Sequence, residues 1–500
     1  MNRIPAVLLV VAFSVVGVIV LESRKKFPAN ESLLVASPRF PPFSSDPLDY
    51  DAMVHHITFS SVYSPLVTNY KLGEMKGIIA ESWTHNDDFS EWNFKIRTGL
   101  RFSNQEAISP LAVYKSFVRV AYKMKVSKSE SGIVEFLQGI SDLSSANGKV
   151  SGISLVGDTL TLRFTKPIPR LITLISFGLY AIVAPSTYDP QTGDWIDSKA
   201  VVSSGAYQIE NWSTHGVSLK LRKDYPAILR HELAYPHIEI LPYDSPRLQN
   251  TPHITIGFSD QVLGSESTTF IGPVESVIRH IRCYHWQDPK HPFFSKEMRQ
   301  KFRDQIYGEM EQRGQPITRS FLPPQLNGIQ QFPSTPVSSP LKFDKDILLP
   351  SGIQIHDSQS TKLPVQEAFL SSLQKIAELS HRKIQFVEET APLTPDTSKS
   401  DLRLMLTDIL IDSPIDDLRF MLLSAHGLKL PDPTGKLKKL VQVRDVDIQS
   451  LNAQLWEDAV IWPISHVAFG FWYDKNSNHD FSQYNAAIGP VDFRWIGTTN

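Results

Sequence analysis

The 500-residue chain contains a single cysteine, Cys283. An intrachain disulfide is therefore impossible, and so is a metal site built from several cysteines. This scarcity does not assign a compartment, because large exported domains with adequate hydrophobic cores fold without disulfides. Stability has to come from packed cores, which a content of 41% hydrophobic residues can supply.

The chain also lacks an excess of charge of either sign. Its 50 basic and 52 acidic residues give a formal net charge of -2. This balance offers no general electrostatic reason for binding nucleic acid or an anionic membrane surface. We therefore expect no nucleic-acid partner.

The common catalytic motifs are missing as well. The sequence has no G-x-S-x-G elbow, no Walker loop, no H-E-x-x-H motif and no dinucleotide-binding glycine fingerprint. Repeats of 20 to 50 residues are also absent. We predict a protein that is not an enzyme and that carries no cofactor.

The best metal candidate in the sequence is the stretch RHIRCYHWQDP, in which His280, Cys283 and His285 offer nitrogen and sulfur ligands. The stretch has the pattern of a strand, where Cys283 and His285 share one face and His280 lies on the other. Side-chain packing in a strand is therefore the favoured interpretation, and we expect no resident metal.

One long apolar run, PAVLLVVAFSVVGVIVL, lies near the N-terminus. As a helix from Ile4 to Leu21 it would extend about 27 Å, close to the thickness of about 30 Å of a bilayer core. It is either a cleaved signal peptide or an uncleaved membrane anchor, and the lack of an A-x-A-like site before Lys25 favours the anchor. Under either interpretation residues 1–26 direct export of the rest of the chain, and as an anchor they would tether it to a membrane.

The rest of the chain has the pattern of a mixed α/β protein. In SEWNFKIRTGLRFSNQEAIS, apolar Trp92, Phe94 and Ile96 alternate with polar residues, and a turn at 98–99 predicts a hairpin with residues 100–102. Ser109 then occupies the N-cap position of a predicted helix. Further alternating patterns predict strands at 160–164, 217–221, 238–240, 254–258, 353–355, 384–386 and 402–406, and spacings of three to four residues predict helices at 294–310, 365–376 and 415–425.

Several short motifs occur in a fixed order between residues 31 and 500. They are AESW at 80–83, R-x-G-x-x-F at 97–102, S-F-x-R at 116–119, SGAY at 204–207 followed by Trp212 and 219–225, HPFF at 291–294 followed by Arg299, SFLPP at 320–324, and WEDA at 456–459 followed by WPI at 462–464. Taken together, this set resembles family 5 extracellular solute-binding proteins, the peptide-binding receptors of ABC importers.

The resemblance implies a two-lobed α/β fold of the type II periplasmic binding proteins, with an extra subdomain inserted in lobe 1. It also predicts domain boundaries. Lobe 1 would comprise residues 31–55, 177–272 and 463–500, with the inserted subdomain at 56–176 and lobe 2 at 273–462.

The resemblance further implies a periplasmic location, with residues 1–26 as the tether to the inner membrane, as well as a ligand and partners. The expected ligand is a peptide or another small solute that the lobes enclose by clamshell closure, and the expected partners are ABC permease subunits in the inner membrane. We expect a monomer. Nickel chelates and haem, which relatives in this family take, remain open as ligands. So does the alternative of a binding scaffold or sensor of the same fold that docks on a membrane protein.

An acidic cluster, LTDILIDSPIDDLRF, follows the last strand predicted before residue 410. Oligopeptide receptors hold the α-amine of their ligand with an aspartate in a G-W-x-x-D-like strand end, and here Leu410 and Thr407 occupy the positions of that aspartate and tryptophan. Asp408 or Asp412 could substitute. Capping of the helix that follows by Asp412 is the alternative interpretation.

The predicted ligand-binding residues come from three segments. They are Tyr63, Ser203, Ser204, Tyr207, Asp408 and Asp412. Tyr63 lies in FSSVYSPLV, which resembles a turn that approaches the ligand in this family, and the two serines precede the turn at 205–207. For Tyr63 and Tyr207 packing in the core is the competing interpretation, and for the serines an ordinary role in a turn.

Overall fold

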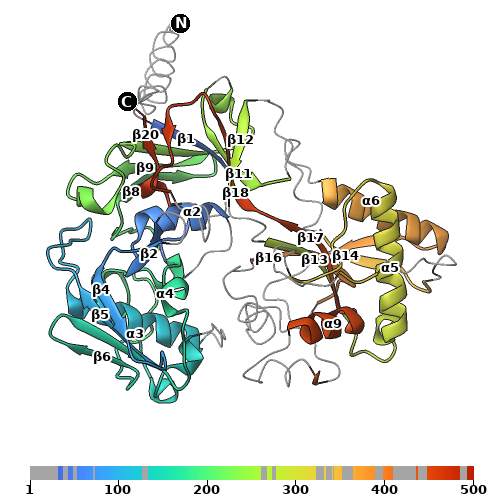
Figure 1. Ribbon diagram of the computed structural model, residues 1–500, viewed down its shortest axis with the longest axis horizontal. Helices are drawn as coiled ribbons and strands as arrows, with labels where there is room; N and C mark the ends of the chain where they lie inside the picture. The colour runs from blue at the N-terminus through green and yellow to red at the C-terminus, as the bar shows by residue number, and fades with distance from the viewer. Residues whose placement is uncertain are drawn as a thin grey trace, which may run out of the picture.

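A computed structural model gives the fold of the chain. It describes residues 32–37, 43–48, 53–70, 74–126, 133–249, 251–260, 267–272, 277–322, 331–333, 341, 343–351, 364–388, 398–408, 435–436, 448–484 and 492–499. The described residues form two bodies joined by a narrow connection (Figure 1), which we call lobe 1 and lobe 2.

Lobe 1 contains a seven-stranded sheet whose central strand, β1 (Ser32–Ser37), is parallel to both of its neighbours. In spatial order the strands are β12 (Thr268–Ile271), β18 (Phe469–Asp474), β11 (Ile254–Phe258), β1, β10 (His237–Pro242), β9 (Gly216–Leu221) and β8 (Tyr207–Ser213). The other pairings in this sheet are antiparallel. Helix α2 (Met53–Val62) contacts β8.

A second sheet of lobe 1 has four strands, β4 (Ala80–His85), β5 (Glu91–Ile96), β7 (Thr159–Arg163) and β6 (Ile153–Val156), in that order. Helix α3 (Pro110–Val126) contacts β6 and β7. The predicted N-cap of α3 is confirmed, because the Ser109 hydroxyl accepts a hydrogen bond of 3.2 Å from the backbone N–H of Ala112. Shorter elements of lobe 1 are β2 (Val67–Tyr70), β3 (Glu74–Gly77), α4 (Leu171–Leu174), β19 (His479–Asp480) and β20 (Gly497–Thr498).

The strand predicted at 92–96 is confirmed, but the predicted hairpin with 100–102 is wrong. Trp92, Phe94 and Ile96 are all buried, as their alternation requires. Strand β5 pairs with β4 on one side and with β7 on the other, so neither edge is left for residues 100–102. Local alternation predicts a strand but does not choose its neighbours, and here the neighbours come from farther along the chain.

Lobe 2 is built around a three-stranded antiparallel sheet in the order β16 (Leu402–Asp408), β13 (Val277–Cys283) and β17 (Ile461–Val467). A parallel pair, β14 (Ile347–Pro350) and β15 (Ile384–Val387), lies beside it. Helices α5 (Lys296–Gln312) and α6 (Pro364–Leu379) pack on each other, and α9 (Ile448–Asp458) contacts β17. Most predicted strands and three of the predicted helices, α3, α5 and α6, thus form where expected, while 353–355 and 415–425 lie outside the described residues.

The short 3₁₀ turns connect these elements. They are Val134–Phe136, Ile140–Asp142, Gly178–Tyr180, Pro185–Thr187, Ala227–Leu229, Pro246–Leu248, Pro292–Phe294 and Phe493–Trp495.

Each lobe has a hydrophobic core of its own. The buried cluster of lobe 1 includes Leu33, Phe94 and Trp495, and that of lobe 2 includes Ile281, Phe302 and Trp462. Among the described residues, these two clusters share no member. Because apolar burial is the main stabilising contribution to a fold, each lobe can remain intact when the other moves.

Two segments carry the chain across between the lobes. One leads from β12 to β13, and the other from β17 to β18 with only Ala468 between the two strands. Figure 1 shows the second crossing as a red ribbon that runs from one body to the other. The boundaries predicted for the domains from the family resemblance stay predictions.

Among the residues that the structure describes, no helix combines the length and the apolar character needed to cross a membrane. Residues 1–26 lie outside those described, so the signal peptide or membrane anchor stays a prediction.

Candidate functional site

The topology of the lobe 1 sheet singles out the carboxyl end of β1. The chain first places β10 on one side of β1 and then crosses to place β11 on the other side, both parallel to β1. In open α/β sheets, ligands bind outside the carboxyl ends of the strands at such a switch point. Strand β11 ends at Phe258, close to the crossing between the lobes, so this edge is our candidate ligand site.

Ser37, the last residue of β1, provides a polar group at this edge. Its side chain is fully buried, and its hydroxyl has no hydrogen-bond partner within the described part of the chain. By contrast, the hydroxyl of nearby Tyr243 already donates to the carbonyl of Ile256. A buried hydroxyl without a partner costs free energy, and a hydrogen bond to a ligand would remove that cost.

Four of the predicted ligand-binding residues lie together, at the end of α2 and the start of β8. The Tyr63 hydroxyl donates to the carbonyl of Ser45 at 2.6 Å, and that of Tyr207 to the carbonyl of Tyr235 at 2.9 Å. Burial raises the pKa of both phenols. The structure therefore shows two neutral tyrosines that are enclosed and already bonded.

The two serines connect the same segments. The Ser204 hydroxyl donates to the carbonyl of Ile182 at 2.6 Å and accepts from the N–H of Ser64 at 2.9 Å. The Ser203 hydroxyl lies within hydrogen-bond reach of the carbonyls of Val62 and Tyr207. These bonds give the serines a structural role in lobe 1, and a role in ligand binding stays a prediction for all four residues.

Asp408 lies in a different place. It is the last residue of β16, and its backbone pairs with Val277, the first residue of β13. This end of the lobe 2 sheet is the one next to the crossing, so the backbone of Asp408 is near the connection between the lobes. Asp412 lies outside the described residues, and the choice between them as partner of a ligand amine stays open.

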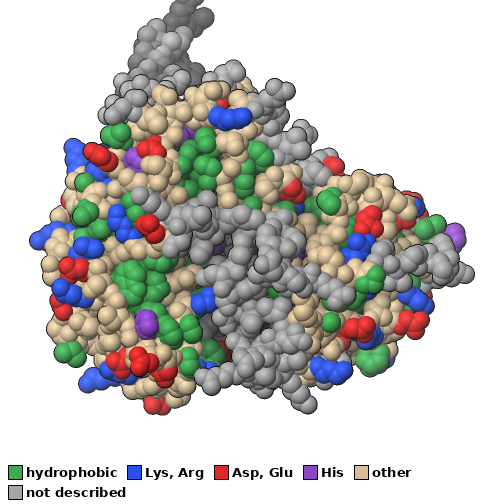
Figure 2. Space-filling model, viewed as in Figure 1, with side chains coloured by type: hydrophobic (Ala, Val, Ile, Leu, Met, Phe, Trp, Pro, Cys, Tyr) green, Lys and Arg blue, Asp and Glu red, His purple; other side chains and the backbone are tan. Residues whose placement is uncertain are grey.

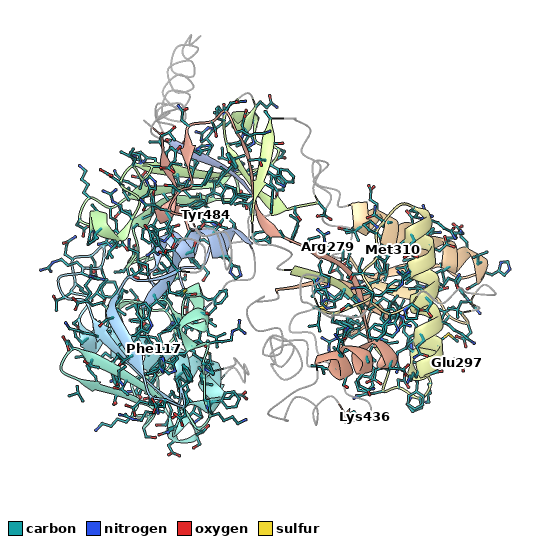
Figure 3. All side chains as sticks on the ribbon, viewed as in Figure 1. Phe117, Arg279, Glu297, Met310, Lys436 and Tyr484 are labelled. Carbon is teal, nitrogen blue, oxygen red and sulfur yellow. The ribbon has the colours of Figure 1, made fainter. Side chains whose placement is uncertain are left out.

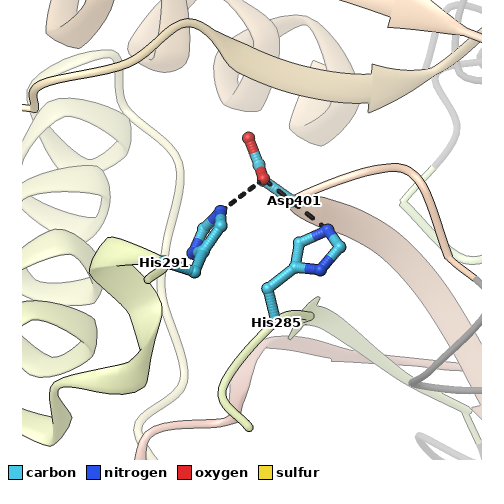
Figure 4. Close-up of side chains that lie close together, drawn as sticks. All are labelled: His285, His291 and Asp401. Atoms are coloured by element: carbon cyan, nitrogen blue, oxygen red, sulfur yellow. Dashed lines mark hydrogen bonds and ion pairs between the residues drawn. The ribbon is translucent and has the colours of Figure 1, made fainter. Parts of the chain in front are cut away.

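A histidine and carboxylate cluster in lobe 2 is the arrangement that most resembles a metal site among the described residues (Figure 4). It contains His285, as the sequence suggested, but its other members are His291 and Asp401, with ligand atoms within 4.8 Å of one another. No local sequence pattern reveals this grouping, because Asp401 is 110 residues from His291.

The hydrogen bonds of this cluster argue against a metal. His291 Nδ1 accepts from the N–H of Phe293 at 3.0 Å, so the ring proton is on Nε2, which donates to Asp401 Oδ1 at 2.9 Å. The Lys345 ammonium lies 3.1 Å from the same oxygen. Burial acts to raise the pKa of Asp401, but the hydrogen bonds from His291 and the Leu348 N–H outweigh it and hold that pKa below its usual range. The cluster is a bonded network around one carboxylate.

His280, the other histidine of the early metal hypothesis, lies on the face of β13 opposite to Cys283, and both side chains are buried. Burial, assisted by the charge of Arg282, lowers the pKa of His280 to about 3. Burial likewise lowers the pKa of His479 in lobe 1 to about 4. Both side chains are neutral at pH 7.

These two histidines predict a loss of stability in mild acid. Since each pKa is lower in the folded state than the ordinary value of about 6.5, the unfolded chain takes up protons first. Their contribution is complete above pH 6.5 and is lost as the pH falls toward 4 and 3. The free energy of unfolding changes with pH by at most about 1.4 kcal/mol per pH unit for each group.

Melting temperatures measured from pH 7.5 to pH 5 should fall less steeply for His280→Met than for the wild type. The exposed control His215→Ala should keep the wild-type slope, and equal slopes for all three proteins would contradict the assignment.

The described part of the visible surface carries no single-sign field. Figure 2 shows Lys and Arg side chains interspersed with Asp and Glu side chains on both lobes. This distribution agrees with the near-zero net charge and gives no support to a polyanionic partner.

Comparison with known proteins identifies the middle of the chain. Residues 74–250 match the model of bacterial extracellular solute-binding proteins, family 5. This segment resembles the middle part of family 5 proteins. A nickel-binding periplasmic protein from Escherichia coli is 38% identical over 58 residues, which are 12% of this chain and 11% of that protein. The aligned stretch thus spans about a tenth of the curated relative.

Solved structures resemble nearly the whole chain. OppA of Haemophilus influenzae in complex with the peptide RPPGFSPFR has a TM-score of 0.68 at 15% identity, covering 95% of this chain and 100% of that one. The Escherichia coli murein tripeptide binding protein MppA has a TM-score of 0.68 at 14% identity, covering 94% and 98%. The family resemblance and the type II periplasmic binding protein fold are therefore confirmed, and the ligand and partners of family 5 members come to this chain only as proposals.

Proposed function

We propose that the protein is an extracytoplasmic solute-binding receptor that delivers a peptide-like ligand to an ABC importer. The observation that carries the proposal is the pair of lobes with separate cores, joined by two crossings next to a switch point of the lobe 1 sheet. A ligand that contacts both lobes favours their closed arrangement by the free energy of those extra contacts. No step of this function requires catalysis.

A peptide is the ligand class that the comparisons favour. One structural neighbour is described in complex with a nonapeptide and another as a tripeptide-binding protein, while the curated relative is described as nickel-binding. Extended peptides are bound through their backbone, with charged groups at the termini and hydrated pockets for side chains. In this chain Ser37 would bind the ligand from lobe 1, and Asp408 or Asp412 would pair with its α-amine from lobe 2.

The proposal also includes a cellular location and binding partners. A receptor of this class works in the periplasm as a monomer and docks on permease subunits in the inner membrane. Residues 1–26 would direct export, and as an uncleaved anchor they would keep the receptor near its permease.

Thermal unfolding with ligand pools tests the proposal. A ligand at 100 times its Kd stabilises the protein by about 2.7 kcal/mol. We expect pools of di- to nonapeptides to raise the melting temperature, and native mass spectrometry of protein purified without denaturation to reveal bound peptide.

A pair of variants links binding to the proposed edge. Ser37→Ala should weaken the response to an active pool, whereas Ser32→Ala should not. Ser32 lies at the opposite end of β1, and its hydroxyl also has no hydrogen-bond partner among the described residues. A response only to nickel chelates or haem would replace peptide as the ligand. No response to any of them would favour the alternative of a scaffold or sensor with a membrane-protein partner.

A further inference from the structure

An ion pair between Arg279 and Asp260 connects the two lobes at their junction. Arg279 is the third residue of β13 in lobe 2, and Asp260 lies two residues beyond the end of β11 in lobe 1. The guanidinium Nη2 is 3.0 Å from Asp260 Oδ1, and Nη1 binds the second carboxylate oxygen. Figure 3 labels Arg279 at the connection between the two bodies.

The surroundings hold the arginine in place. Its side chain is 1% exposed, and the guanidinium carbon lies 4.9 Å from the centre of the Phe258 ring. Phe258 in turn packs edge-on against Phe469, the first residue of β18, at 5.4 Å between ring centres. Such cation and aromatic contacts stabilise a guanidinium that water does not reach.

The ion pair lies next to one of the covalent crossings. The N–H of Ser259 donates to the carbonyl of Ala468 at 2.9 Å, and the N–H of Ala468 donates to the Ser259 hydroxyl at 3.1 Å. In addition, the pairing of β13 with β17 shifts register between Arg279 and His280. A bulge of this kind redirects side chains, and here it falls beside the residue that reaches across to lobe 1.

We propose that the ion pair of Arg279 and Asp260 is a latch that sets the angle between the lobes in the ligand-free protein. The described crossing has only Ala468 between β17 and β18, and rotation of its backbone dihedrals would change the angle between the lobes. Within the described part of the chain, the ion pair adds a noncovalent connection beside this crossing. Parting the two groups would leave a buried guanidinium without its counter-charge, which is costly, and this cost limits rotation about the crossings.

Distances between spin labels test the latch in the full chain without any ligand. Val156 in lobe 1 is 78% exposed and the Glu297 side chain in lobe 2 is 75% exposed, so both accept labels after Val156→Cys and Glu297→Cys. The native Cys283 is buried and will not react. Asp260→Asn should broaden the distance distribution and shift its mean relative to the wild type.

Two further variants complete the test. Arg279→Met keeps aliphatic packing on Phe258 without the charge and should reproduce the Asp260→Asn result. Glu239→Gln breaks the ion pair of Glu239 with Arg247, which lies within lobe 1, and should leave the distances unchanged. Wild-type distances in both latch variants, or equal broadening in the Glu239→Gln control, would overturn the proposal. Since no ligand is present, a failed latch leaves the proposed receptor function standing.

Discussion

Gly205→Ala should prevent lobe 1 from folding correctly. A Cβ at residue 205 would lie 2.3 Å from the carbonyl oxygen of Ser61 and 2.7 Å from that of Val62. Both atoms belong to the backbone of α2, and the Gly205 N–H donates to the Val62 carbonyl at 2.8 Å. Since neither backbone can give way without breaking this contact, we expect a loss of about 3 kcal/mol or more, at the upper end of what overpacking costs. Soluble yield and the unfolding temperature of lobe 1 would measure it.

The same substitution in lobe 2 provides the control. Gly308 lies inside α5, and a Cβ there would have no heavy atom within 4 Å. Alanine is favoured over glycine within a helix by about 0.5 to 1 kcal/mol, so Gly308→Ala should stabilise lobe 2 slightly. Equal unfolding temperatures for the two variants would contradict the steric argument.

Gly205 also illustrates why the family could be predicted from sequence. It belongs to one of the motifs that carried the resemblance, and other motif residues have similar structural roles. The Arg97 Nε donates to the carbonyl of Ile78 at 3.0 Å, and the Arg299 Nη2 donates to the carbonyl of Asp458 at 2.9 Å. Contacts of this type fix how segments distant in sequence meet, so the order of the motifs along the chain predicts the fold.

The candidate site could not be predicted in the same way. Nothing in the sequence distinguishes Ser37 from other serines. Only the sheet topology shows that it lies at the carboxyl end of a strand between two parallel neighbours. Arg279 and Asp260 have no local pattern, and only the arrangement of the two lobes brings them together. The motifs that did stand out, such as residues 203–207, are those whose polar atoms bond within the protein. Sequence motifs therefore predict residues that stabilise the fold more readily than residues that bind a ligand.

The scaffold and the candidate site place different demands on the sequence. The fold needs a fixed set of buried arginines, glycines and tyrosines, while the ligand needs only groups that face the space between the lobes. A family can then keep the first set and exchange the second. At the positions where the family resemblance implies an aspartate and a tryptophan, the sequence has Leu410 and Thr407, so the identity of the ligand is a question for the peptide pools.

Arg494→Met should strongly destabilise lobe 1. The side chain is fully buried, and its Nε lies 2.8 Å from Asp492 Oδ2. Its Nη2 donates to the carbonyl of Ser60 at 2.8 Å, and its Nη1 donates to the Ser64 hydroxyl at 3.1 Å. The C-terminal segment is thereby joined to the end of α2. Loss of one partner of a buried ion pair costs about 3 to 5 kcal/mol, because the other charge is left without compensation.

A double variant separates the charge from the packing. Burial raises the pKa of Asp492 while Arg494 acts to lower it, so without the arginine the carboxyl group should become protonated more readily. Asp492→Asn combined with Arg494→Met removes both charges and should recover part of the lost stability, as a double-mutant cycle by chemical denaturation would show. The single Arg494→Met variant should also gain stability as the pH falls toward the raised pKa of Asp492, opposite to the trend expected from the histidines. Additive losses in the cycle would mean that Arg494 acts through its bonds to α2 and not through Asp492.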